Sequence, residues 1–351
     1  MSRIFFCGLL LIISCSKDQA AFSQSNRLIY VSALPSECHD GCSLQMITRE
    51  VGWLRGRSTL WHTENGGRGW RAQQLPPTNS RADYIEVEFA DRNLGWLLRP
   101  GSQLLYETQN GGIQWTRWAL PKIDGIFQAA WFGSDGGRWL GGGLYRHSST
   151  PDAPNYALKK YESGDWGILN PVIFSFARSS KDWREHDPPP CAWVIVNLRF
   201  WDDRNGVAVG DTCFYYTETG GEQWRTAVFH DGKSFATNYP LGTSHPVITF
   251  LDRAHGWLSI EDGALYYTSD GGKNWFRKVS SNIPYLEAIH FTTLTHGFGI
   301  GRGAKLYEST DGGATWDARS IGIRARSFIV LDGKYAWLLS DESLYRFRLS
   351  K

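Results

Sequence analysis

The sequence predicts an all-β protein, a seven-bladed β-propeller with four antiparallel strands per blade and the last blade closed by the N-terminal strand. Three observations support this: a phrase that recurs along the chain, a second phrase that precedes it, and an N-terminal segment that matches a strand missing from the last repeat. The composition agrees, because 351 residues include 17 Trp, 15 Tyr, 18 Phe and 38 Gly. Many aromatic residues and glycines together favour short strands and tight turns.

The first phrase is Leu-Tyr-x-Thr-x-Asp-Gly-Gly-x-x-Trp. It occurs at residues 60–70, 105–115, 214–224, 265–275 and 306–316, with conservative replacements. We interpret Leu144-Tyr145 and a segment ending at Trp166 as a degenerate copy that an insertion has split. The closing tryptophans lie 41 to 58 residues apart, which is close to the length of one propeller blade.

The second phrase is a Gly followed by a large apolar residue, as in Gly52-Trp53 and Gly256-Trp257. Together the two phrases divide residues 247–280 into four predicted strands, at 247–251, 256–260, 264–268 and 275–279. The intervening turns are of hairpin length, so the unit is an antiparallel meander. Such a unit buries its faces only against neighbouring copies, which favours a closed ring of blades.

The seventh repeat, at residues 328–349, has only three predicted strands. Residues 28–35, Leu-Ile-Tyr-Val-Ser-Ala-Leu-Pro, match the fourth strand of the earlier repeats, which ends in Leu-Pro at 75–76 and 120–121. We therefore expect the N-terminal strand to pair with the last repeat and to remove a free sheet edge.

The first 14 residues predict a lipoprotein signal peptide. Arg3 precedes an apolar run at 4–13, and Ile12-Ile13-Ser14-Cys15 resembles the bacterial lipobox. We expect Cys15 to be acylated, residues 15–27 to form a tether and residues 28–351 to form the propeller. The expected location is a membrane-anchored, exported protein facing the periplasm or the cell surface. Cleavage near Ala20-Ala21, which would leave a soluble periplasmic or secreted protein, is the alternative.

An exported protein meets an oxidising environment. Cys7 lies in the signal peptide and Cys15 is expected to carry the lipid, so we expect disulfides among the remaining Cys38, Cys42, Cys191 and Cys213. Three pairings are open, and we favour Cys38–Cys42 with Cys191–Cys213. Although Cys38-His39-Asp40 offers three metal-ligand types, no second Cys/His cluster has ligand spacing. We expect no metal and no cofactor.

The Asp of the recurrent phrase is predicted to have a structural role, because Asp270 and Asp311 occupy the same position in successive repeats. A short polar side chain there can accept backbone N–H groups inside the turn. Thr-x-Asp-x-Gly-x-x-Trp resembles the Asp-box, or BNR repeat, of sialidases and other propellers. With these phrases over residues 28–351, the chain resembles the photosystem II stability and assembly factor family. That resemblance implies an exported seven-bladed propeller, which is a lipoprotein in cyanobacteria.

Candidate binding residues lie where turns join the second and third strands, and on long irregular segments. We single out Arg55, Arg57, Arg99 and Arg302 in such turns, since arginines can clamp acidic groups. The stretches 177–191 and 230–245 read as long loops, and the first contains Trp183, Arg184 and His186.

No catalytic residue is predicted. The formal net charge of +2 argues against a nucleic-acid partner. We expect a monomeric, non-catalytic scaffold, like an assembly factor, that binds another envelope or membrane protein. The alternatives are a sialidase-like glycoside hydrolase and a glycan-binding propeller.

Overall fold

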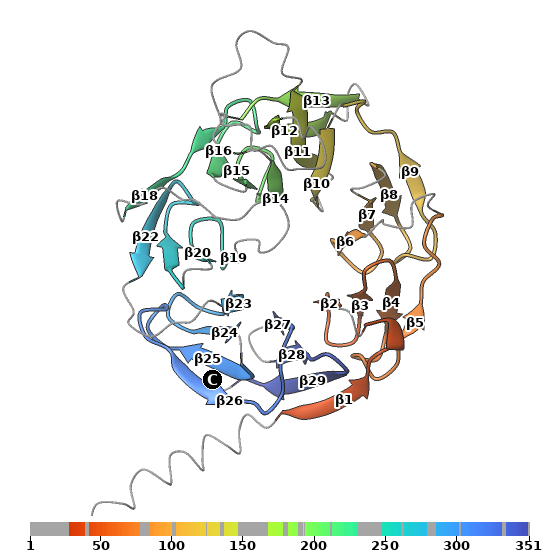
Figure 1. Cartoon of the computed structure of the whole chain (residues 1–351), viewed down its shortest axis with the longest axis vertical. Helices are drawn as coiled ribbons and strands as arrows, with labels where there is room; N and C mark the ends of the chain where they lie inside the picture. Colours follow the sequence, from red (N-terminus) through yellow and green to blue (C-terminus); the bar gives the residue numbers. More distant parts are fainter. Residues whose placement is uncertain are drawn as a thin grey trace, which may run out of the picture.

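Seven β-sheets surround a common axis in the computed structural model (Figure 1). The structure describes residues 28–38, 42–77, 85–99, 103–123, 125–133, 137–146, 168–177, 182–188, 192, 194–210, 213–230, 247–260, 263–278, 286–301, 303–331 and 335–349. The predicted all-β, seven-bladed propeller is confirmed. In these ranges the only helical element is the 3-10 turn η1 (Ser36–Cys38), and no helix long and apolar enough to cross a membrane is found.

The blades follow one another along the chain, and the first strand of each lies nearest the axis (Figure 1). Blade 1 comprises β2 (Ser43–Met46), β3 (Gly52–Arg55), β4 (Leu60–Thr63) and β5 (Arg71–Ala72). Blade 2 comprises β6 (Glu86–Phe89), β7 (Gly95–Arg99), β8 (Leu104–Thr108) and β9 (Thr116–Trp118). Blade 3 comprises β10 (Gly125–Phe132), β11 (Arg138–Arg146), β12 (Ile168–Ala177) and β13 (Asp182–His186).

The remaining blades repeat the same antiparallel order. Blade 4 comprises β14 (Ile195–Phe200), β15 (Gly206–Gly210), β16 (Phe214–Thr217) and β17 (Arg225–Thr226). Blade 5 comprises β19 (Val247–Phe250), β20 (Gly256–Ser259), β21 (Leu265–Thr268) and β22 (Asn274–Lys278). Blade 6 comprises β23 (Leu286–Phe291), β24 (Gly297–Gly301), β25 (Lys305–Ser309) and β26 (Asp317–Ser320), and blade 7 contains β27 (Ser327–Leu331), β28 (Tyr335–Leu339) and β29 (Ser343–Arg348).

Blade 7 receives its fourth strand from the other end of the described chain, as predicted. Strand β1 (Ile29–Ala33) pairs antiparallel with β29, with Tyr30 opposite Tyr345 and Ala33 opposite Ser343. Figure 1 shows β1 lying along the outside of β29, so that the first and last strands meet. The pairing closes the ring and covers the outer edge of β29.

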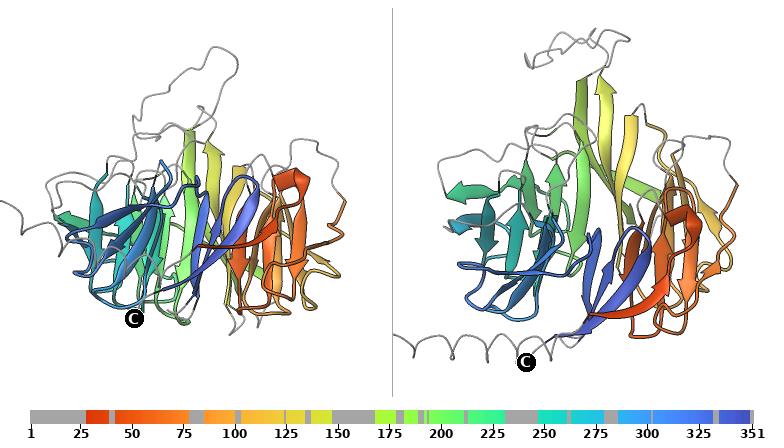
Figure 2. Two further views of the ribbon diagram at one scale, coloured as in Figure 1. Left: turned by 90° about the horizontal axis from the view of Figure 1, so that it is seen from below. Right: turned by 60° about the horizontal axis from the view of Figure 1, so that its bottom comes forward.

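The two rims of the ring differ in their turns. The Asp-box rim, as we call it, carries the turns from first to second strand and from third to fourth strand of each blade. The opposite rim carries the turns from second to third strand and the connections between blades. Blade 3 rises above its neighbours at one rim, because β11 and β12 are the longest pair (Figure 2).

Aromatic residues hold neighbouring blades together. Trp53 of β3 stacks on Phe89 of β6 with ring centroids 3.6 Å apart, and Trp257 of β20 stacks on Phe291 of β23 at 3.7 Å. The indole nitrogen of Trp53 also donates to the carbonyl of Gly111 in the next blade at 3.1 Å. Each contact joins one blade to the next, so the core is a set of interfaces between blades.

The Gly of the second phrase makes room for an aromatic residue of the first strand of the same blade. A Cβ at Gly95 would lie 2.4 Å from the ring of Phe89, and one at Gly297 would lie 2.4 Å from the ring of Phe291. Both glycines begin the second strand and pair directly with that aromatic residue of the first strand. The phrase therefore encodes close packing of a ring over the neighbouring strand.

Blade 3 departs from the sequence prediction. Leu144-Tyr145 lies in the second strand, β11, and the third strand is instead β12, whose Trp139–Ser175 and Leu144–Asn170 pairings fix its register. The expected closing residue Trp166 lies outside the described residues. The prediction failed because the insertion follows a lengthened second strand, so that the motif search matched the wrong member of the hairpin. The apolar run 168–176 was the signal for the true third strand.

The two stretches expected to be loops also contain strands. Within residues 177–191, β13 forms the fourth strand of blade 3. Residues 231–245 of the second stretch lie outside the described part, but β18 (Val228–His230) runs parallel to β22 along the outer edge of blade 5. Blade 5 is thus a five-stranded sheet whose extra strand comes from the segment that follows blade 4.

Candidate functional site

In the Asp-box turns, the polar side chains form hydrogen bonds with the backbone of the same turn. Thr268 Oγ1 accepts the backbone N–H of Gly272 at 3.0 Å and donates to Asp270 Oδ1 at 2.9 Å, and the backbone N–H of Asn274 donates to the same carboxylate oxygen at 3.0 Å. Burial opposes ionisation of Asp270, but hydrogen bonds from Asn274, Thr268 and Lys273 outweigh it and hold its pKa below the usual value. The geometry supports the structural role that we predicted for this residue.

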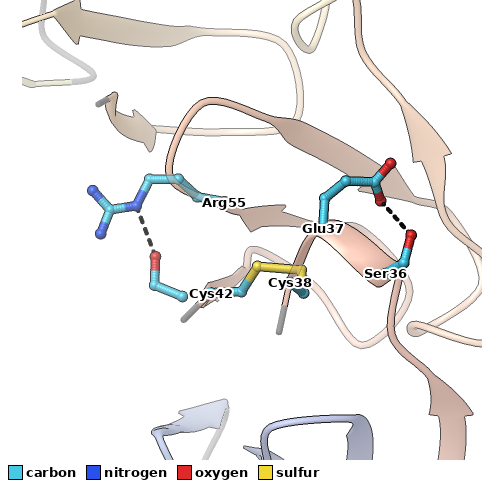
Figure 3. The surroundings of a disulfide bond; sticks show 6 residues. Ser36, Glu37, Cys38, Cys42 and Arg55 are labelled. Carbon is cyan, nitrogen blue, oxygen red and sulfur yellow. Dashed lines mark hydrogen bonds between the residues drawn. A yellow bond between two sulfur atoms is a disulfide. The ribbon is translucent and has the colours of Figure 1, made fainter. Parts of the chain in front are cut away.

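Arg55 lies on the opposite rim, where it ties blade 1 to blade 2. Its Nε donates to Ser43 Oγ at 2.8 Å, and its Nη1 donates to the carbonyl of Ile85 at 3.0 Å and pairs with Glu86. Figure 3 shows its side chain beside the disulfide of the same blade. A guanidinium that spans two blades in this way is already occupied within the chain.

The other predicted arginines differ in availability. Arg99, which is 3% exposed, ends β7 and donates from Nη2 to the carbonyl of Pro76 at 3.0 Å. Arg57 is exposed, two residues beyond Arg55, and its carbonyl accepts the N–H of Ile85. Arg302 lies outside the described residues. Of the described three, Arg57 is the one that can reach a partner without giving up an existing contact.

A disulfide joins Cys38, at the end of η1, to Cys42, immediately before β2 (Figure 3). It fixes the connection between the closing strand β1 and blade 1, with Cα atoms 5.2 Å apart. Cys213 is also disulfide-bonded. Its predicted partner Cys191 lies outside the described residues, as does the predicted lipidation residue Cys15.

The three candidates on β13 have separate environments. His186 is buried against Trp139 and lies 2.7 Å from Ser175 Oγ, and burial lowers its pKa. Arg184 is exposed and pairs with Glu222 of the next blade through both guanidinium nitrogens. His186 is therefore part of the core, while Arg184 links blades 3 and 4. Only Trp183 of the three lines a surface hollow.

That hollow is a groove of about 510 Å³ between the outer strands of blades 2 and 3. The rings of Trp118, Phe176 and Trp183 pack edge-on, with centroids 4.8 to 6.5 Å apart. The indole nitrogen of Trp183 donates to the carbonyl of Ala119 at 2.8 Å. The groove is also lined by Glu107, Gln109, Thr116, Arg117, Leu120, Pro121 and Asp182. It combines a rigid aromatic wall with polar groups at its margin, the pattern typical of a binding site.

Sequence reasoning missed most of this groove. Trp118 and Phe176 come from different blades, and only the fold brings them to Trp183. The signal within reach was Trp118 itself, an apolar residue on a short outer strand whose other residues, Thr116 and Arg117, are exposed.

No group of three or more residues able to hold a metal ion occurs among the described residues. The innermost strands do carry ionisable residues, Glu88 on β6, Arg199 on β14 and His290 on β23. This set contains a single arginine. It lacks the arginine cluster expected of a sialidase, at least within the described ranges.

With this geometry in view, we compared the chain with known proteins. No protein-family model matches it. The photosystem II assembly protein Ycf48 of Synechococcus sp. (strain JA-2-3B'a(2-13)) is 27% identical over 287 residues, which cover 74% of this chain and 81% of the relative. The chain is similar to Ycf48. The photosystem II assembly lipoprotein Ycf48 of Synechococcus sp. (strain CC9902) is 24% identical over 148 residues, or 40% of each protein.

Solved structures agree on the fold. A structure described as YCF48 bound to D1 peptide superposes with a TM-score of 0.59 at 17% identity, covering 93% of this chain and 97% of the other. YCF48 from Cyanidioschyzon merolae gives a TM-score of 0.58 at 15% identity, covering 92% of this chain and 98% of the other. A structure described as that of U3-55K fits equally well, with a TM-score of 0.60 at 8% identity over 93% of this chain and 99% of the other. These likenesses establish the architecture that this chain shares with Ycf48.

Proposed function

We propose that this protein is a non-catalytic scaffold that binds an extended segment of another envelope or membrane protein in the groove between blades 2 and 3. The observation that carries the proposal is the aromatic wall of Trp118, Phe176 and Trp183, which belongs to a rigid sheet interface. Similarity to Ycf48 supports the same class of function, since the relatives are named as assembly proteins and a structure of one is described as bound to a peptide.

The groove is better suited to binding a peptide than to catalysing a reaction. Strand β9 is the outer strand of blade 2 and β13 that of blade 3, so neither has a further strand on its outer side within the described ranges. A free strand edge can pair with an extended segment while an apolar side chain of that segment packs on the rings. On the opposite rim, Arg57 would add an ionic contact to acidic residues of the same partner.

A cross-linked pull-down from detergent-solubilised membranes of the source organism tests this function. We expect one membrane protein to be retained, and Arg117→Glu on β9 to reduce its recovery several-fold. Arg225→Glu, on the outer strand β17 of blade 4, makes the same charge change away from the groove and should leave recovery unchanged. Equal recovery with all three proteins would exclude the groove, and turnover of a fluorogenic glycoside panel would exclude the non-catalytic function.

We also propose that Cys15 anchors the protein to a membrane as a monomer, with the Asp-box rim nearest the lipid. Strand β1 begins beside Arg346, near the end of β29, and the third strands of all blades end at that rim. Replacing Cys15 by Ala should move the protein from the membrane fraction to the soluble fraction and abolish labelling with a fatty-acid analogue. Retention in the membrane fraction by the variant would contradict the anchor.

A further inference from the structure

Three ionisable residues occupy equivalent positions on the first strands of alternate blades. Glu88 pairs with Trp96 in blade 2, Arg199 with Val207 in blade 4, and His290 with Phe298 in blade 6. In each blade this partner is the second residue of the second strand, so the three positions lie at one level around the axis. The innermost strands β6, β14 and β23 surround that axis from three directions (Figure 1).

The equivalent residues of the other blades are uncharged. Gln45 of β2 bonds both the N–H and the carbonyl of Phe89, each at 2.9 Å. Trp131 packs against Phe200, and Thr249 is buried. Ile329 packs against the hydrophobic cluster between blades 7 and 1. Glu88, Arg199 and His290 are thus the ionisable side chains at this level of the innermost strands.

Glu88 and Arg199 influence each other without touching. Both side chains are solvent-accessible, and neither has a hydrogen bond or ion pair among the described residues. Burial raises the pKa of Glu88, and Arg199 partly offsets this rise; burial likewise lowers the pKa of Arg199 against the attraction of Glu88. Burial and the charge of Arg199 lower the pKa of His290 to about 4, so the imidazole is neutral at pH 7.

Glu88 and Arg199 carry opposite charges, keep access to solvent and have no hydrogen-bonding partner among the described residues, so both are open to a charged ligand. A single anion would satisfy Arg199 but leave Glu88 unpaired, and a single cation would do the reverse. A molecule that carries both charges a short distance apart would satisfy both. The ring of Phe250, 5.9 Å from the Arg199 guanidinium carbon, offers an apolar contact beside them.

We propose that the axis of the ring holds a binding site for a small zwitterion, of which a free α-amino acid is the simplest. Its carboxylate binds the guanidinium of Arg199, its ammonium binds the carboxylate of Glu88, and the neutral imidazole of His290 completes the site with one hydrogen bond. The site lies on the inner strands, away from the groove of the proposed function, so either can hold without the other.

Isothermal titration of the full chain in non-ionic detergent with a panel of free L-amino acids tests the site. Sodium acetate and methylammonium chloride are the single-charge probes. We expect at least one amino acid to bind, and both single-charge probes to bind at least about tenfold more weakly, because each loses one charged hydrogen bond.

The variants Glu88→Gln and Arg199→Gln should each weaken amino-acid binding at least about tenfold. Arg57→Gln, which removes an exposed arginine from the opposite rim, should leave it unchanged. Thermal melting of each variant shows that the fold is intact. The proposal is overturned if no amino acid binds at millimolar concentration, if acetate binds as tightly as the amino acid, or if Arg57→Gln weakens binding as much as Arg199→Gln.

Discussion

At the scale of the residue, one hydroxyl and one short polar side chain organise each Asp-box turn. The replacement of Asp by Asn65 and Asn110 preserves this arrangement, because an amide oxygen accepts the same backbone N–H groups. Asn110 Oδ1 accepts from Gln114 at 2.8 Å, and Asp311 Oδ1 accepts from Thr315 at 2.8 Å. The turn thus needs an acceptor at this position, and it does not need a charge.

Substitutions at Asp270 separate these two properties. Asp270→Ala removes the acceptor from two backbone N–H groups and should lower the free energy of unfolding by about 1–2 kcal/mol. Asp270→Asn keeps an acceptor and should cost less, as measured by urea denaturation at pH 7. Equal losses for both variants would show that the charge, rather than the acceptor, stabilises the turn.

His290 makes stability depend on pH. The unfolded chain binds a proton at this residue near pH 6.5, whereas the folded chain binds it only near pH 4. The unfolded state therefore holds more protons in this window, and the folded state loses stability as the pH falls from about 6.5 to about 4. His290→Gln should reduce that loss in denaturation curves between these values. The control His230→Gln, at the exposed edge of β18, should retain the wild-type dependence.

At the scale of the element, blades 2, 4, 5 and 6 each place a glycine opposite a phenylalanine ring, at Gly95, Gly206, Gly256 and Gly297. Gly95→Ala would place a Cβ against Phe89, which itself stacks on Trp53 of the preceding blade. We expect a loss of about 1–3 kcal/mol from overpacking. The control Gly69→Ala, whose Cβ meets only the end of the Asn65 side chain at 3.3 Å, should cost less.

A double mutant tests whether the loss in Gly95→Ala comes from the contact with the Phe89 ring. If Gly95→Ala acts through Phe89, combining it with Phe89→Leu should cost less than the sum of the two single losses. Additive losses would assign the effect of Gly95→Ala to the backbone instead.

The sequence predicted the elements that repeat and misplaced those that do not. Residues 247–280 yielded strands that agree with β19 to β22 within two residues at each end, because the phrases mark both turns and strands. The same reasoning misassigned the third strand of blade 3, because that strand lacks the Asp-box phrase. The groove formed by Trp118 and Trp183, and the axial set that includes Glu88, depend on contacts between blades, which no local pattern contains.

At the scale of the whole molecule, the ring is closed by the pairing of β1 with β29. The variant Tyr30→Cys with Tyr345→Cys places two thiols on directly paired residues, a separation at which disulfides form. Peptide mapping by mass spectrometry should find this cross-link in most oxidised molecules, together with a higher melting temperature. Tyr30→Cys with Lys305→Cys, on β25 of blade 6, should give no cross-link, and a link there would contradict the closure.

The same pairing has a consequence for how the chain is made. Among the described strands, β1 is synthesised first and β29 last. Strand β1 therefore stays unpaired until the six intervening sheets have been synthesised and have packed. An exposed strand of that kind can pair with a second nascent chain during the wait. In a truncated chain that lacks β29, strand β1 would have no pairing partner. Loss of the C-terminal residues should therefore cause association between molecules rather than only a local destabilisation of blade 7.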